Sequence, residues 1–265
     1  NPAGILFFCE FCLAFFVKEV ELAAHVRKCL VRHPPGNEIY RSQEQNINIS
    51  MFEIDGAKEI EYSQNLCFLA KLFLDHKTLQ FDTQPFLFYI LCETTSFGQH
   101  IVGYFSKEKH SEQNNNVACI LTLPAHQRKG FGNFLISFSY ELTRIEGKVG
   151  TPERPLSDLG EVTYRKYWNQ VLVKLLIELE MSGITMDELS RRTCFRPEDI
   201  FTTLQESGII KYSNSEHIID LTQAKVREFT ASKKLDPTQP HVGRCIPSKI
   251  HWTPFKLTKQ QKLSY

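Results

Sequence analysis

The sequence predicts a mixed α/β fold, with a small metal-binding unit at its start and a helical segment towards its end. Three observations support this prediction: short runs of β-branched and aromatic residues, a helical pattern that follows a glycine-containing turn, and a closely spaced group of cysteine and histidine residues. The 265 residues are 42% hydrophobic, which is enough to bury a sizeable core.

Composition limits the partners that we expect. The formal net charge is only +1, so we expect weak or no intrinsic DNA binding. No apolar run reaches the roughly 18 residues of a membrane span and no signal peptide is visible, so we expect a soluble, intracellular chain without membrane contact. Three of the eight cysteines crowd together with a histidine and the others are scattered singly, which favours a reducing compartment over a set of disulfides.

The region before residue 110 predicts a polar connection followed by mixed α/β structure. Residues 32–48 contain two prolines and a glycine and are typical of a linker. We expect a strand at 51–54, turned by the hairpin dipeptide Asp55-Gly56. Apolar and aromatic runs predict a helix over 64–75 and strands over 85–92 and 101–105.

The middle of the chain predicts a loop, a strand and a long helix. Residues 110–116 are polar, and the continuous apolar run 117–123 is typical of a strand that is buried on both faces. Apolar residues then recur at helical spacing from Phe131 to Ile145, and Gly147 follows where a left-handed cap is expected.

The last hundred residues predict a mainly helical segment. The stretch 151–160 contains two prolines and is expected to be a loop before a helix over 164–181. A capping box at 185–188 opens a short helix, and Pro197 opens another that stops at Gly208. Two short apolar runs, 209–212 and 217–220, then favour a helix-turn-helix with a β-wing.

The strongest metal signal is the spacing Cys9-x2-Cys12-x12-His25-x3-Cys29. Two close thiolates and a His/Cys pair one helical turn apart can converge tetrahedrally on zinc, and unrelated residues rarely share this spacing. Four protein ligands fill the coordination shell, so we expect a structural rather than a catalytic zinc. The apolar residues between the ligands are expected to form a small core: Phe15, Phe16, Val17, Val20 and Leu22.

The second signal is the turn Gln127-Arg128-Lys129-Gly130-Phe131-Gly132, between an expected strand and an expected helix. Glycines let backbone N–H groups approach a pyrophosphate, the helix N-terminus adds partial positive charge, and the two basic side chains add more. Glycine at a strand–helix turn is often only a packing residue. The flanking strand and amphipathic helix are what favour phosphate binding here.

Several stretches, in order along the chain, resemble the MYST family of histone acetyltransferases. They are FLDHKTL (73–79), PFLFY (85–89), VGYFSKEK (102–109), NNVACILTLP, QRKGFG, FSYEL and PERPLSDLG, and the spacing of the metal ligands is similar too. The resemblance implies a GNAT-like acetyltransferase core at 32–165. It also implies a zinc finger at 1–31 and a helix-turn-helix-like, winged-helix segment at 166–265.

The resemblance also implies roles for particular residues. Glu153 matches the general base of the family, Cys119 a cysteine proposed as a transient acetyl acceptor, and Lys77 a lysine that is autoacetylated. The implied contacts to acetyl-CoA lie on the strand, on the glycine turn and on a later serine: Ile120, Thr122, Gln127, Arg128, Lys129, Gly130, Phe131, Gly132, Asn133 and Ser157.

Chemistry supports these roles independently but less firmly. A lysine ammonium must lose a proton before its nitrogen can attack a thioester, which requires a carboxylate beside the acyl carbon. Without the resemblance, Glu153 would be interpreted as a surface residue, Cys119 as a core cysteine and Lys77 as a solvated lysine. The sequence leaves open a covalent acetyl-enzyme at Cys119, although we favour direct attack. His126 and Lys166 differ from the residues usual in the family.

We therefore expect a nuclear histone lysine acetyltransferase that uses acetyl-CoA, carries a structural Zn²⁺, and acts on histone tails or nucleosomes within a multisubunit complex. One alternative is a chromatin- or DNA-binding module that has lost catalysis, which the intact Glu153 and glycine turn disfavour. Another is an acetyltransferase for non-histone amines, which would have no use for the zinc unit.

Overall fold

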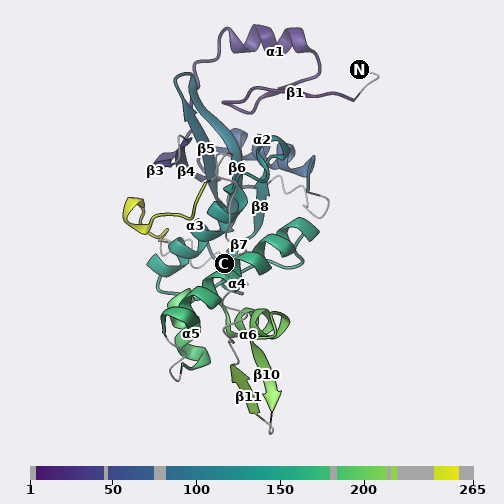
Figure 1. Cartoon of the computed structure of the whole chain (residues 1–265). Coiled ribbons are helices and arrows are strands. Elements are labelled where there is room, and N and C mark those ends of the chain that lie inside the picture. The colour runs from purple at the N-terminus through teal and green to yellow at the C-terminus, as the bar shows by residue number, and fades with distance from the viewer. Residues whose placement is uncertain are drawn as a thin grey trace.

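A five-stranded antiparallel sheet forms the centre of the molecule, with strands in the order β3-β4-β5-β6-β8 (Figure 1). The computed structural model describes residues 4–44, 47–74, 82–179, 184–213, 216–219 and 242–256. The strands of the central sheet are β3 (Asn37–Glu44), β4 (Ile47–Asp55), β5 (Phe86–Thr95), β6 (Gly98–Glu108) and β8 (Cys119–Thr122).

Helices cover both faces of this sheet. Successive side chains of a strand point to opposite faces, so Tyr89 of β5 packs in the cluster that α3 (Phe131–Ile145) completes. Its neighbour Ile90 packs on the other face, in the cluster that contains residues of α2 (Ile60–Lys71). Burial on both faces explains why the expected strands at 85–92 and 101–105 have such apolar sequences, and both predictions are confirmed.

The long helix α3 follows the predicted pattern. Its apolar side chains lie in the core except that of Ile145, which is 45% exposed. Gly147 adopts a φ of +67° just after the end of the helix, as expected of a left-handed cap. The preceding helix is shifted from the prediction, because α2 covers Ile60–Lys71 rather than 64–75.

Three further helices form a second cluster at one end of the molecule (Figure 1). They are α4 (Asp158–Glu178), α5 (Met186–Thr193) and α6 (Pro197–Glu206), and a hairpin of β10 (Ile210–Ser213) and β11 (Glu216–Ile219) follows them. The predicted N-cap of α5 is confirmed, because Thr185 Oγ1 accepts the Glu188 N–H at 3.2 Å. The predicted start of α4 at residue 164 is wrong, because the helix begins at Asp158 and Ser157 caps it. Residues 75, 180, 181 and 220 of the predicted helices and strands lie outside the described residues.

The N-terminal unit lies at the opposite end and consists of β1 (Phe7–Phe8), β2 (Phe15–Phe16) and α1 (Glu19–Val26) (Figure 1). The expected apolar core of this unit is wrong, because α1 has no buried residue and Val20 is 72% exposed. Leu13 is instead buried in the α2-side core, and the ring of Phe15 stacks on Phe68 at 4.7 Å. The unit is therefore attached to the main core rather than packed around one of its own.

Residues 242–256 pack back onto the central core and include the short helix η2 (Pro247–Lys249). The Val242 N–H donates to the Lys129 carbonyl at 2.8 Å, and the His251 N–H donates to the Ile39 carbonyl at 2.8 Å. This segment therefore joins the turn before α3 to the edge strand β3.

Three further sequence expectations need correction. Residues 32–48 are not a linker throughout, because β3 begins at Asn37 and forms a hairpin with β4. Asp55-Gly56 is not a hairpin turn: it leads into α2, and a Cβ at Gly56 would lie 2.0 Å from the Thr83 carbonyl oxygen. The strand expected at 117–123 is shorter and lies at the sheet edge, with Cys119, Ile120 and Thr122 only half-buried.

In the described part of the chain, no helix combines the length and apolar character that a membrane span requires.

Candidate functional site

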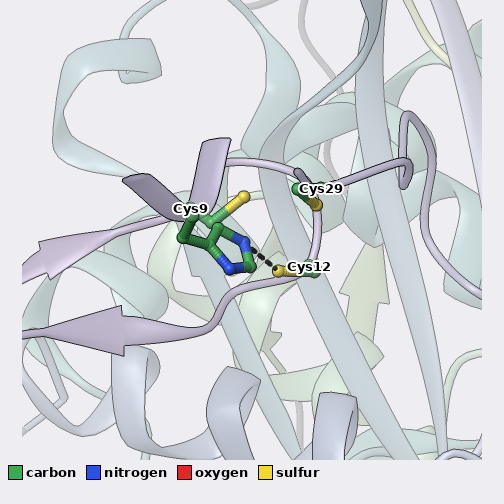
Figure 2. A group of neighbouring side chains, drawn as sticks. Cys9, Cys12 and Cys29 are labelled. Carbon is green, nitrogen blue, oxygen red and sulfur yellow. Dashed lines mark hydrogen bonds between the residues drawn. The ribbon is translucent and has the colours of Figure 1, made fainter. Parts of the chain in front are cut away.

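The predicted metal ligands converge. Cys9 and Cys12 lie on the turn between β1 and β2, His25 lies in the last turn of α1, and Cys29 follows it. Their ligand atoms all lie within 4.8 Å of one another, and Cys12 Sγ is 3.2 Å from His25 Nε2. Figure 2 shows the three cysteine side chains gathered around this contact.

The donor set fits a tetrahedral metal ion. Zinc bound by thiolates at about 2.3 Å separates its sulfurs by roughly 3.8 Å, so four donors within 4.8 Å need only small side-chain movements. The pKa of Cys12 is raised to about 12, mainly by burial and further by the neighbouring Cys9 and Cys29 sulfurs. A divalent cation would reverse this shift by favouring the thiolates. This Cys3His cluster could therefore hold a metal ion.

A second site is a cleft of about 640 Å³ between the sheet edge and the start of α4. Seven of the residues expected in the active site line it together: Cys119, Ile120, Thr122, Gln127, Gly132, Glu153 and Ser157. The other expected contacts, Arg128, Lys129, Gly130, Phe131 and Asn133, lie on the adjoining turn and first turn of α3 and do not line it. The Phe131 side chain is buried in the core. Lys77 lies outside the described residues.

Cys119 begins the edge strand β8, opposite Ser106 of β6. Its N–H donates to Ser106 Oγ at 3.1 Å. Among the described strands β8 is the last of its sheet, so one edge of it pairs with no further strand, and its residues line the cleft.

Glu153 reaches the same cleft from a different part of the chain. It follows β9 (Thr151–Pro152), which pairs in parallel with β7 (Asn115–Val117), just before β8. The Glu153 N–H donates to the Val117 carbonyl at 2.8 Å. This bond holds the backbone of Glu153 near the start of the strand that carries Cys119.

Two helix N-termini border the cleft and provide partial positive charge. Gly130 caps α3 with a φ of +90°, and Gly132 in the first turn lines the cleft. A Cβ at Gly132 would make only ordinary contacts, 3.4 Å from Thr122 Oγ1 and 3.8 Å from Thr163. At the second N-terminus, Ser157 Oγ accepts the Gly160 N–H at 3.2 Å. Free backbone donors at such termini are suited to an anion such as a pyrophosphate.

The cleft is also lined by large apolar side chains that the sequence did not single out as site residues. They are Phe73 and Leu74 from the segment after α2, and Phe86 and Phe88 from β5. Apolar residues of this kind carry no sequence signal that separates a cleft wall from a core. The cleft thus combines an apolar section, a thiol, a carboxylate and an anion-binding edge.

Comparisons with known proteins found similar sequences over most of the chain. Residues 33–244 match the model of the MOZ/SAS family. The chain is 54% identical over 260 residues to "Histone acetyltransferase of the MYST family 1" of Arabidopsis thaliana, covering 97% of this chain and 55% of that protein. It is 47% identical over 248 residues to "Histone acetyltransferase ESA1" of Mycosarcoma maydis, covering 94% of this chain and 42% of that protein. The chain thus spans about half the length of the relatives it matches.

Proposed function

The chain belongs to the MOZ/SAS family, and from this premise we propose that it transfers the acetyl group of acetyl-CoA to the ε-amine of a lysine in a histone tail. The observation that carries the proposal is the cleft, where Glu153, Cys119 and two helix N-termini meet. Similar proteins bear the name histone acetyltransferase, which supports the choice of substrate.

The coenzyme would lie along β8 and the start of α3. Backbone N–H groups around Gly132 would bind its pyrophosphate, assisted by Arg128 and Lys129 on the preceding turn. Ile120 and Thr122 on the strand and Ser157 at the start of α4 would contact the pantetheine arm. Gln127 would act indirectly, because its Nε2 donates to the Thr122 carbonyl at 3.2 Å.

Glu153 would take a proton from the substrate ammonium, because only the neutral amine can attack the thioester carbon. The N–C bond then forms, the C–S bond breaks, and coenzyme A leaves as the thiol after it gains a proton. Backbone donors of β8 would stabilise the oxyanion. We favour this direct transfer over a route through an acetyl thioester on Cys119.

The cysteine–histidine cluster would hold a structural zinc ion through Cys9, Cys12, His25 and Cys29. The support is the donor set and its 4.8 Å span. With all four positions occupied by protein ligands, this ion would stabilise the N-terminal unit and take no part in acetyl transfer.

We further propose three units: a zinc finger at 1–31, a catalytic core at 32–165 and a helix-turn-helix-like, winged-helix segment at 166–265. The α5–α6 pair and the β10–β11 hairpin support the last assignment. The expected setting is the nucleus, within a multisubunit complex that acts on histone tails or nucleosomes, with weak or no intrinsic DNA binding. Lys77 remains the proposed autoacetylation site.

Acetylation of histone tail peptides by Glu153→Gln tests the proposal. Glutamine keeps the size but accepts no proton, so we expect kcat to fall roughly 100-fold or more while acetyl-CoA binding survives. The loss should shrink as pH rises, because more substrate amine is then neutral. Cys119→Ala, the comparison variant, should lose much less activity if transfer is direct.

Near wild-type rates for Glu153→Gln at neutral pH would contradict the assignment of the base. Wild-type protein that binds acetyl-CoA but acetylates only non-histone amines would favour the alternative substrate class. Wild-type protein with no acetyltransferase activity would favour a binding module.

A further inference from the structure

The segment that carries Glu153 is held from two sides. On one side, β9 pairs with β7, and the Glu153 N–H is bonded to the Val117 carbonyl. On the other side, the Gly150 N–H donates to the Cys194 carbonyl at 3.0 Å, and Gly150 forms a parallel bridge with Phe195. The second contact comes from the connection between α5 and α6, far from Glu153 in the sequence.

Arg154, the residue after Glu153, makes a second link to the same helices. Its Nη2 donates to Asp199 Oδ1 at 2.8 Å, and its guanidinium lies 5.9 Å from the centre of the Trp168 ring. Asp199 lies in the first turn of α6 and is only 5% exposed. Its other oxygen, Oδ2, is buried without a hydrogen-bond partner among the described residues.

This pair is poorly arranged for stability alone. The Arg154 side chain is 56% exposed, so solvent screens its attraction to the carboxylate. Asp199 loses hydration on burial, and its Oδ2 gains no hydrogen bond in return. The clear consequence of the contact is geometric, because it fixes the residue next to Glu153 relative to α6.

We propose that Asp199 is a positioning residue, which acts through Arg154 to hold the Glu153 carboxylate where it can accept the proton of the substrate. This inference rests on the proposed function, in which Glu153 is the base. It makes the α5–α6 helices part of the apparatus for acetyl transfer, in addition to any binding role.

Asp199→Asn tests the inference, because asparagine keeps the size and removes the charge. Misplacement of a reacting group by about 1 Å can cost roughly 100-fold, so we expect kcat to fall by about 10- to 100-fold. The KM for acetyl-CoA should stay within about twofold, because the Asp199 side chain bonds to Arg154, which is not among the residues proposed to bind the coenzyme. Arg154 itself lines the cleft, so Asp199 is the cleaner position to change.

The decisive readout is the effect of Asp199→Asn in the Glu153→Gln background. A residue that acts through the base has no further effect once the base is gone, so the residual rate should stay within about twofold. An equal proportional loss in both backgrounds would overturn the inference in favour of a merely structural role. Arg154→Gln breaks the same pair from its exposed end and replaces Asp199→Asn if that variant melts below the assay temperature.

Glu206→Gln is the matched control. It removes the ion pair between Arg165 and Glu206, which joins α4 to α6 at 2.9 Å but does not touch the Glu153 segment. We expect a wild-type kcat for this control, and a loss equal to that of Asp199→Asn would overturn the inference. Wild-type activity of Asp199→Asn beside an impaired Glu153→Gln would refute only the positioning role. An active Glu153→Gln would remove the base assignment, and the positioning role with it.

Discussion

Gly132→Ala separates stability from coenzyme binding. Gly132 lies in the first turn of α3 with an ordinary helical backbone, and the added methyl would make only ordinary contacts with Thr122 and Thr163. Alanine is preferred over glycine in helices and loses less entropy on folding, so the variant should gain about 0.4–1 kcal/mol of stability. For a chain of this size, the melting temperature should rise by roughly 1–4 °C.

The same methyl would lie beside Thr122 and Thr163, which line the cleft where we propose that a phosphate approaches the backbone. Loss of one hydrogen bond to a charged group costs about 1.5–3 kcal/mol. The Kd for acetyl-CoA should therefore increase roughly 10- to 100-fold.

Titration calorimetry and thermal unfolding of the same preparations measure both quantities. Gly130→Ala is the contrasting variant, since Gly130 has a φ of +90° and alanine there is strained by about 1–2 kcal/mol. It should lower the melting temperature, whereas Gly132→Ala should raise it. A folded Gly132→Ala protein that binds acetyl-CoA as tightly as wild type would refute the proposed phosphate site.

Two further predictions concern the cysteine–histidine cluster and His126, the residue before the glycine turn. Cys12→Ser should reduce the zinc content from about one per chain and destabilise the N-terminal unit, as measured by metal analysis and unfolding; wild-type protein purified without zinc would contradict this. Burial, followed by the Lys129 charge, lowers the pKa of His126 below 6.5, so as the pH falls through that value the unfolded state takes up a proton that the folded state resists. From neutral pH to about pH 5.5, roughly one unit below an ordinary histidine pKa, His126→Phe should therefore lose less stability than wild type, as measured by guanidinium unfolding. Equal losses would show that His126 does not contribute.

The sequence predicted the elements whose patterns are local. The helical spacing of α3, its glycine cap and the Thr185 N-cap of α5 all depend on neighbouring residues, and the structure confirms them. The convergence of the four candidate metal ligands was also predictable, because their spacing is determined by one turn and one helix end.

Elements that depend on distant contacts were not predictable. The polar sequence of β3 does not look like a strand. Its Tyr40 is covered by residues 242–256, and this contact between distant segments cannot be deduced from the sequence around β3. Gly56 resembled a hairpin residue, but the close approach of the Thr83 carbonyl is what requires glycine there. Likewise, nothing near Glu153 in the sequence indicates its connection to Asp199.

The packing of residues 242–256 also has a consequence for the order in which the chain is made. Lys249 Nζ donates to Ser42 Oγ at 2.7 Å across a separation of 207 residues. During synthesis, therefore, the outer side of β3 remains uncovered long after the rest of the sheet has left the ribosome. An uncovered strand edge can pair with other chains, so the nascent protein passes through a period of aggregation risk in which chaperones would have their greatest effect.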